Sequence, residues 1–499
     1  MLEKPAVYGA AQTTVTDTHH KALSINLNAS KYGAFAEIGA GQEVVRWFFL
    51  VGGASGTVSR SISAYDMTVS DYQYGPARRY VSRERLESML ECEWNVLQEQ
   101  LYAKRGKDTE FFVFANTVAA RSYHGSDECH GWMGVRYQSA PESPPNQTVM
   151  HVRMLDRDAV GQQEALGILG VNLLYAALNG GYTTPEAALH SLLDGLTPQR
   201  LEVDMVHLSG PSSKGVDHRL LSLQLVQMQL SDAAMFSATG EVLQPSEALY
   251  KRSVLIERGS FRPVTHVNVD MMQSARNRFK QECRDNGDTE ETEPLVLAEL
   301  TMRKLQPSKT NPFVGIEAQG SSEIDSTPYA IDYQDFLARA DLLAASGMTV
   351  LISDFFEYYR LATYVGRLTS REVRLVMGVP SVREIMDESY YEGLEGGILE
   401  SLGRLFKNDL RLYVYPLLEN GELVTAETMT PAPNLRHLYQ HLLDNRRVIG
   451  LPEYRREYLP IFSREVLVRI AAGDTSWEAM VPPAVAEKIK DCGYFGCRP

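Results

Sequence analysis

The residues with the clearest chemical potential lie in one short segment near the middle of the chain. Residues 253–256 form an apolar run that predicts a strand, and residues 269–284 have the spacing of an amphipathic helix. A Gly-Ser pair between them is typical of the first βα turn of a nucleotide-binding sheet. Such a turn directs backbone N–H groups and the positive end of a helix at one spot, which stabilises phosphate. The segment therefore predicts a phosphate site made of Gly259, Ser260, Phe261, Thr265, His266 and Asn268.

A second group of reactive side chains lies within residues 121–134. Its members could bind a divalent ion or act as acids and bases: His124, Asp127, Glu128, Cys129 and His130. Adjacent Cys129 and His130 rarely reach one metal together, and no second ligand pair follows, so we assign no metal ligand. A general acid or base role for His124 or His130 and a hydrogen-bonded loop without catalytic role both stay open. His151, on the next predicted strand, could approach this loop.

A third motif, Glu37-Ile38-Gly39-Ala40-Gly41, lies between a predicted strand and a predicted helix. It resembles the first motif of the S-adenosylmethionine-dependent methyltransferases, and Asp66 falls where their ribose-binding acid is expected. Gln42 stands where a third small residue is usual. The pattern therefore favours a structural βα turn over a methyl-donor site.

The composition excludes several classes of protein. The 499 residues are 44% hydrophobic and 22% charged, which is ordinary for a globular chain and excludes overall disorder. A formal net charge of −14 argues against nucleic acid or an anionic membrane as partner. The five cysteines are scattered and odd in number, which argues against a disulfide framework. Neither a signal segment nor a long apolar span is evident, so we expect a cytoplasmic protein without a membrane partner.

The second half of the chain alternates strands with helices. Strands are predicted at residues 253–256, 294–302, 349–353, 373–377 and 410–415, and helices at 269–284, 333–345, 355–367, 381–388 and 397–406. Because these strands are apolar throughout, they predict a parallel, doubly wound sheet that is covered by helices on both faces. The predicted fold class is α/β.

The remaining patterns set the expected domain boundaries. In the first half, predicted helices at 82–104 and 158–178 and a strand at 200–208 indicate an α/β or α+β domain without a Walker loop. We divide the chain into an N-terminal arm (1–30), this first domain (31–245), a Rossmann-like parallel-sheet domain (246–430) and a helical tail (431–499). The arginine pair Arg455-Arg456 in the tail could hold phosphate or a neighbouring subunit, although a solvated surface is the commoner role.

The run Gly259-Ser-Phe-Arg-Pro-Val-Thr265 resembles the signature of the nicotinamide/nicotinate mononucleotide adenylyltransferases. That resemblance implies binding of ATP and Mg²⁺, adenylyl transfer to a mononucleotide, and roles for Thr265 and His266 at the phosphates. Asn268 stands where the family has its second histidine. The segment 378–383 is loosely similar to a later family motif, which implies that Arg383 helps to hold the triphosphate. The whole chain also resembles an uncharacterised family of bacterial proteins that often carry the same adenylyltransferase label.

Two other functions stay open at this stage. Because Asn268 breaks the histidine pair, the same architecture could serve as a non-catalytic oligomeric scaffold or regulator, and we expect a homo-oligomer. The loop at 124–130 could instead belong to a metal-dependent or histidine-based hydrolase. A nucleotide-binding protein that transfers an adenylyl group is the function that we expect first.

Overall fold

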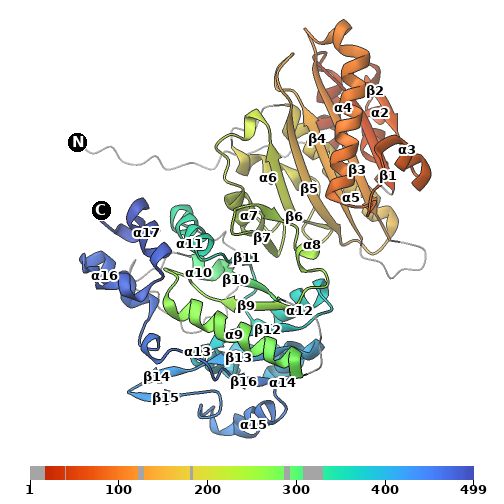
Figure 1. Ribbon diagram of the computed structural model, residues 1–499. Coiled ribbons are helices and arrows are strands. Elements are labelled where there is room, and N and C mark those ends of the chain that lie inside the picture. Colours follow the sequence, from red (N-terminus) through yellow and green to blue (C-terminus); the bar gives the residue numbers. More distant parts are fainter. Residues whose placement is uncertain are drawn as a thin grey trace. The chain divides into compact units, whose positions relative to one another are not determined.

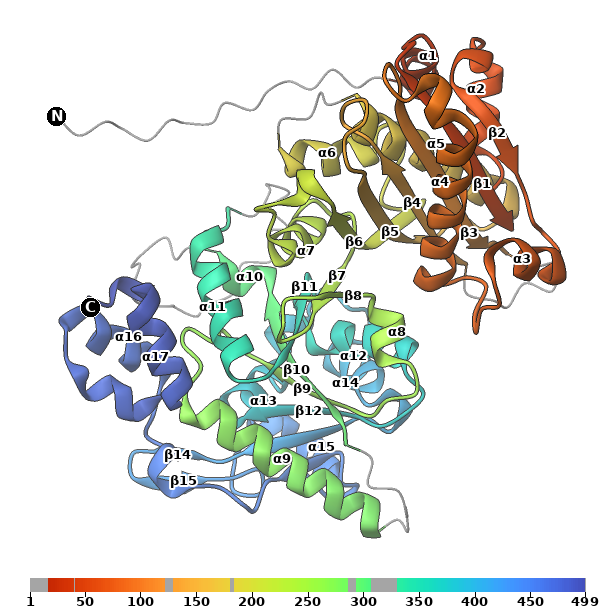
Figure 2. The same cartoon turned by 45° about the horizontal axis from the view of Figure 1, so that its top comes forward.

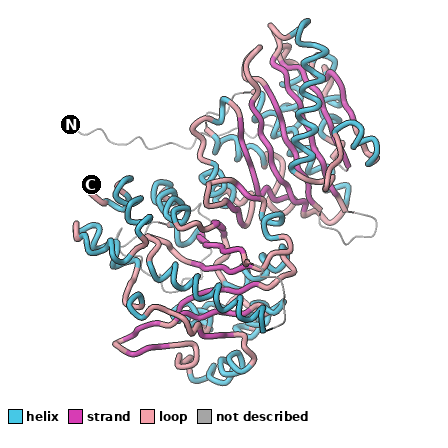
Figure 3. Tube along the Cα trace, viewed as in Figure 1, coloured by secondary structure: helices cyan, strands magenta, loops and turns pink. Residues whose placement is uncertain are grey.

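The structure is a computed structural model. It describes residues 17–39, 41–121, 129–179, 184–285, 293–306 and 330–498. The chain divides into two compact units, Met1–Val216 and Asp217–Pro499, each built of helices around its own main sheet (Figures 1 and 3). Both sheets contain parallel and antiparallel pairs, so the fold is α/β with mixed sheets.

The first unit contains a six-stranded sheet in the order β2-β1-β3-β4-β5-β6. Its strands are β1 (Lys31–Gly39), β2 (Val58–Ile62), β3 (Glu110–Ala119), β4 (His130–Tyr137), β5 (Asn146–Met154) and β6 (Leu201–Ser209). The strands β2, β1 and β3 run parallel to one another, and β3 to β6 form an antiparallel series.

Helices cover the sheet of the first unit. They are α1 (Thr18–Asn26), α2 (Val44–Leu50), α3 (Met67–Tyr74), α4 (Arg83–Arg105), α5 (Ala159–Leu178) and α6 (Pro185–Leu192). Gly134 of β4 lies against Leu86 and Leu90 of α4, and Gly170 of α5 lies against Phe114 of β3. Side chains alternate across a strand, so these contacts place α4 and α5 on opposite faces.

The second unit contains an eight-stranded sheet in the order β16-β13-β12-β9-β10-β11-β7-β8. Its strands are β7 (Ala233–Phe236), β8 (Val242–Leu243), β9 (Val254–Arg258), β10 (Leu295–Thr301), β11 (Thr349–Ser353), β12 (Val373–Gly378), β13 (Arg411–Tyr415) and β16 (Val448–Gly450). Six of them, from β16 to β11, are parallel, whereas β7 and β8 add antiparallel pairs at one edge. A hairpin of β14 (Leu417–Glu419) and β15 (Glu422–Val424) lies apart from this sheet.

Helices pack on both faces of this sheet and bury a hydrophobic core on each. One core joins α7 (His218–Gln227), α9 (His266–Asp285), α11 (Tyr333–Ala345), α16 (Ser463–Ala472) and α17 (Pro483–Cys492). The other joins α8 (Pro245–Leu249), α12 (Tyr358–Leu368), α13 (Val379–Ile385), α14 (Gly397–Leu405) and α15 (Arg436–Asp444). The short α10 (Met302–Leu305) follows β10. Figure 2 shows α9 running along the sheet on the first of these faces.

The predicted wholly parallel sheet is thus confirmed only in part. The prediction at residues 349–353 matches β11, and the helix predicted at 333–345 matches α11. The pairing of β7 with β11 makes the sheet mixed, and it places residues before 246 in the same sheet as β9. Within the predicted N-terminal arm, residues 18–26 form α1, and its buried Lys21 donates hydrogen bonds to Asn172 and Asp194.

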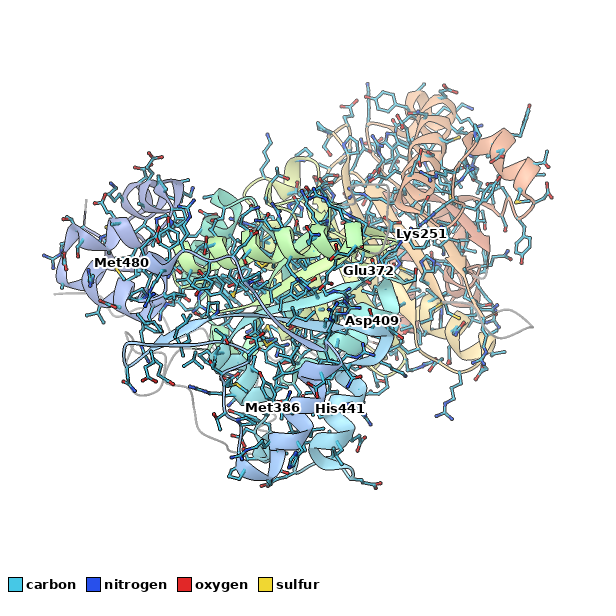
Figure 4. The ribbon with its side chains drawn as sticks, turned by 60° about the horizontal axis from the view of Figure 1, so that its bottom comes forward. Lys251, Glu372, Met386, Asp409, His441 and Met480 are labelled. Atoms are coloured by element: carbon cyan, nitrogen blue, oxygen red, sulfur yellow. The ribbon has the colours of Figure 1, made fainter. Side chains whose placement is uncertain are left out.

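The amino ends of the parallel strands in the second unit are held by polar contacts. Figure 4 labels Lys251, Glu372 and Asp409, which precede β9, β12 and β13. Ser253 donates a hydrogen bond of 2.8 Å to Glu372. Asp409 pairs with Arg411 at 3.0 Å and, through its other oxygen, with an arginine beside β16 at 2.8 Å. This edge is therefore tied together by side chains, and the candidate site lies at the opposite, carboxyl-terminal edge.

Candidate functional site

The bend that follows β9 is tightly packed. A side chain on Gly259 would come within 2.9 Å of the Phe261 ring, which explains the glycine. Phe261 is 1% exposed and belongs to the core under α9, so its ring holds the bend to the sheet. The Gly259 N–H already donates a hydrogen bond to the Glu299 carbonyl at 3.2 Å. Ser260 is exposed, and its carbonyl oxygen accepts a hydrogen bond from the Arg339 guanidinium. Gly259 thus has no spare amide, while Ser260 faces solvent.

Thr265 and Asn268 form the cap of α9. The Asn268 side-chain oxygen accepts hydrogen bonds of 2.9 Å from both the amide and the hydroxyl of Thr265. This is the backward half of a capping box, in which the third helical residue bonds the capping residue. The Asn268 amide group in turn donates to Glu257 on β9 at 2.6 Å. Both residues are therefore used to start the helix, and Thr265 is only 2% exposed.

Glu257 is the unusual group beneath this cap. Its side chain is 2% exposed, and its Oε2 atom has no hydrogen-bond partner among the described residues. Burial raises the pKa of Glu257 to about 8, and the hydrogen bond from Asn268 only partly opposes that rise. At neutral pH the carboxyl group is therefore largely protonated, so it adds little negative charge under the helix end.

His266, the first residue of α9, lies in an aromatic and basic cluster. Its ring stacks on Tyr458 with centroids 4.7 Å apart and planes 9° from parallel. Arg455 lies over the same Tyr458 ring and donates to the Tyr458 hydroxyl at 3.1 Å. Partial burial, and then the charge of Arg455, lower the pKa of His266. The segment after β16 thus brings a cation and an aromatic ring to the start of α9.

Asp270 fixes this segment against the first turns of the helix. It accepts hydrogen bonds from the Tyr415 hydroxyl at 2.5 Å and from the Arg455 amide at 2.9 Å. Tyr415 is the last residue of β13, which pairs with β12. Asp270 therefore joins three parts of the chain at the carboxyl edge, and its other oxygen lies 3.9 Å from Nε of Arg455, whose side chain stays mostly exposed.

Arg383 follows β12 on α13, as the sequence predicts for the neighbouring βα unit. Its guanidinium makes two hydrogen bonds of 2.8 Å, and both go to Glu419 on β14. A bidentate pair of this kind fixes the side-chain direction. The structure therefore holds Arg383 at the β14–β15 hairpin, and it brings Arg455 rather than Arg383 to the start of α9.

A buried ion pair stiffens the end of β9. Arg258 donates to both oxygens of Glu299 on β10 at 2.8 and 2.9 Å, and to the Phe356 carbonyl at 2.7 Å. Ser353 on β11 also donates to Glu299, at 2.6 Å. Because the side chains of both partners are nearly inaccessible, removal of one charge would leave the other without compensation.

The two other sequence candidates lie in the first unit. Glu37 accepts hydrogen bonds from the amides of Val44 and Val45 at the start of α2, and one from Asn116. In the motif that resembles that of the methyltransferases, the Glu37 carboxyl group therefore already occupies the amino end of α2. Burial raises the pKa of Glu37 to about 7. Asp66 caps α3 by accepting from two backbone amides.

Of the 124–130 group, His124, Asp127 and Glu128 lie outside the described residues. His130 begins β4 and forms a 3.0 Å hydrogen bond with His151 of β5, as the proximity of these elements suggested. In the ranges that the structure describes, no group of three or more His, Cys, Asp or Glu side chains is placed to hold a metal ion. No described helix has the length and apolar composition required to cross a bilayer.

Neither a protein-family model nor a curated protein matches the sequence. Several solved structures show limited similarity. A competence/damage-inducible protein from Agrobacterium tumefaciens is 17% identical, covering 33% of this chain and 93% of its own, with a TM-score of 0.22. A competence-damaged (CinA) superfamily protein from Klebsiella pneumoniae is 9% identical, covering 33% and 99%, with a TM-score of 0.26. One from Escherichia coli is 17% identical, covering 38% and 95%, with a TM-score of 0.23. Scores this low carry no argument about function, which we therefore infer from geometry.

Proposed function

We propose that the second unit binds a nucleotide at the carboxyl edge of its sheet, with the phosphates at the start of α9. The observation that supports this most directly is the strand order. From β11 the parallel strands run β10, β9, β12, β13 and β16, which is the 3-2-1-4-5-6 order of dinucleotide-binding sheets. Ligands of such sheets bind where the order reverses, beyond the carboxyl ends of the first and fourth strands. Here these strands are β9 and β12, and α9 starts at that point.

The donors at this point suit an anion. A helix leaves its first amides without an internal acceptor, and those of His266, Val267 and Asn268 make no hydrogen bond elsewhere in the described parts of the chain. The helix dipole adds partial positive charge, the Arg455 guanidinium adds a full one, and the neutral His266 ring can donate a hydrogen bond. The stacked rings of His266 and Tyr458 offer a flat surface next to these donors, on which a base could stack.

The proposal includes the predicted cofactors ATP and Mg²⁺. Mg²⁺ in nucleotide sites is commonly held by one or two carboxylates together with phosphate oxygens and water. The described residues include no metal cage, and Asp270 already accepts two hydrogen bonds. The phosphates would therefore supply most ligands of the ion. Asn268 is used as a cap, so adenylyl transfer to a mononucleotide would depend on the charge of Arg455 and on hydrogen bonding by the neutral His266 ring.

Titration calorimetry of the full chain with ATP and MgCl₂ tests the binding step. The variant Arg455→Gln removes the exposed cation, and we expect roughly tenfold weaker binding, as for the loss of one charge-assisted hydrogen bond. The matched control is Arg436→Gln, since Arg436 is an exposed arginine on α15. Release of pyrophosphate from ATP with nicotinamide or nicotinate mononucleotide then tests the reaction.

The outcomes separate the alternatives. Binding of ATP without pyrophosphate release would support nucleotide binding and reject adenylyl transfer. Absence of heat with ATP would overturn the proposed function, and an oligomer detected by light scattering in the same preparation would then favour the scaffold. Equal affinity of the wild type and Arg455→Gln would show that the site is not at α9.

A further inference from the structure

The first unit contains a chain of three hydrogen-bonded side chains that crosses its antiparallel strands. Asp204 on β6 lies 2.7 Å from Nδ1 of His151 on β5, and Nε2 of His151 lies 3.0 Å from Nδ1 of His130 on β4. His151 is 1% exposed and Asp204 is 2% exposed, whereas His130 is partly exposed. The chain thus runs from the interior to a histidine that solvent can reach.

This arrangement fixes the tautomer of both rings. A carboxylate can only accept, so His151 donates from Nδ1 to Asp204, and its Nε2 then carries a lone pair. That lone pair accepts from Nδ1–H of His130, which leaves the lone pair of His130 on Nε2. Trp132 packs on the His151 ring with centroids 4.9 Å apart and limits its rotation. The neutral His130 therefore presents a base in a set orientation.

The groups around His130 come from each neighbouring element. Arg153 lies opposite it on β5 and pairs with Glu202 on β6 at 2.7 Å. His130 lies on the same face of the sheet as Gly134, which is the face covered by α4. Besides burial, the positive charge of Arg79, which precedes α4, also lowers the pKa of His130. Burial, and then the neighbouring His151, lower the pKa of His130 to about 4. His130 is accordingly neutral over the physiological range, and the positive charges of Arg153 and Arg79 contribute to this lowering.

We propose that His130, oriented by His151 and Asp204, is the general base of a second, hydrolytic site that cleaves a small ester or carboxamide. His130 Nε2 takes a proton from water while the water oxygen bonds to the acyl carbon. The developing negative charge on the carbonyl oxygen is stabilised by the charges of Arg153 and Arg79. The bond from carbon to the leaving oxygen or nitrogen then breaks, and the proton on His130 passes to the leaving group. The products are a carboxylic acid and an alcohol or amine.

A buried network without catalytic role would contain the same bonds, so the test needs a readout that packing alone does not change. The probes are 4-nitrophenyl acetate and 4-nitroacetanilide, with the full chain and its variants. We expect His130→Ala to lower kcat/KM for the cleaved probe by about 100-fold or more. Added imidazole should restore part of that loss, because it supplies the missing base. The matched control is His190→Ala, which removes an exposed histidine of α6 and also corrects for hydrolysis by imidazole itself.

Asp204→Asn tests the orienting role, since asparagine keeps the volume and can turn the His151 ring to the wrong tautomer. We expect kcat to fall by about 10- to 100-fold with KM nearly unchanged. Circular dichroism must show native helix content for each variant, and His130→Gln replaces His130→Ala if that variant unfolds. Equal rates of the wild type and the His130 variant on both probes would overturn the proposal. A loss in folded His130→Ala that imidazole leaves unchanged would also overturn it.

Discussion

The raised pKa of Glu257 makes the stability of the second unit depend on pH in a direction that can be calculated. Its pKa rises from 4.5 to about 8 on folding, so between these values the folded state binds the extra proton. This contribution to stability is complete below about pH 4.5 and is lost as the pH rises through about 8. Each pKa unit corresponds to about 1.4 kcal/mol, so the loss between about pH 5.5 and 8 is about 3 kcal/mol.

Glu257→Gln imitates the protonated side chain and tests this directly. Glutamine can still accept from Asn268 through its side-chain oxygen, so we expect stability close to that of the wild type near pH 5.5. Near pH 8.5 the variant should be more stable by about 2–4 kcal/mol, because it cannot ionise. Urea unfolding at both pH values, followed by fluorescence and fitted with separate transitions for the two units, gives the difference.

The comparison with the wild type cancels other groups that titrate in the same range, such as Glu37. Glu395→Gln is the control, because it makes the same substitution at an exposed position. If the curves of the wild type and Glu257→Gln stay parallel from about pH 5.5 to 8.5, the reasoning about burial is refuted. A variant that is much less stable at both pH values would show that Glu257 is needed as a charge, which contradicts a protonated carboxyl group.

Three further outcomes follow from the contacts described above. Asn268→Ala should lower the free energy of unfolding, measured in urea, by about 1 kcal/mol because the α9 cap is lost. Asn268→Asp should restore much of that free energy. An unchanged free energy of unfolding in both variants would contradict the capping role. Arg258→Met should lower the free energy of unfolding by about 3–5 kcal/mol because Glu299 stays buried without its partner. A decrease below about 1 kcal/mol would show that water reaches the ion pair. The ring protons of His130 should keep their NMR shifts from about pH 7.5 to 5.5, since its pKa lies near 4; a midpoint near 6.5 would exclude the buried environment.

Much of the second unit could be predicted from local sequence alone. The expected strand at 349–353 and helix at 333–345 match the structure, because long apolar runs and helical spacing depend on neighbouring residues. The strand β4 was missed because its sequence contains Gly131 and Gly134, which are typical of loops. The structure explains one of them: a side chain on Gly134 would come within 2.7 Å of the Thr148 carbonyl and close to α4. Such a requirement arises only from tertiary packing.

The candidate site was predictable only where its residues are neighbours in sequence. The βα order placed Thr265, His266 and Asn268 in a turn before a helix at 269–284, whereas in the structure α9 already begins at His266. It could not show that Arg383 pairs with Glu419, nor that Arg455 returns to α9, since both depend on segments distant along the chain. An arginine pair after the last strand was the available signal for Arg455, but nothing local distinguishes such a pair from a solvated surface.

The two βα turns that the sequence singled out differ in what satisfies the helix end, and this difference favours the second unit as the anion site. At α2, the amides of Val44 and Val45 already bond the Glu37 carboxyl group, so an incoming phosphate would have to displace an acid of the protein itself. At α9, the corresponding acid, Glu257, bonds the Asn268 side chain instead of the amides, and burial keeps it largely protonated. No carboxylate therefore bonds the first amides of α9 among the described residues, since Asp270 bonds Tyr415 and Arg455 instead, and this leaves those amides to the anion that we propose.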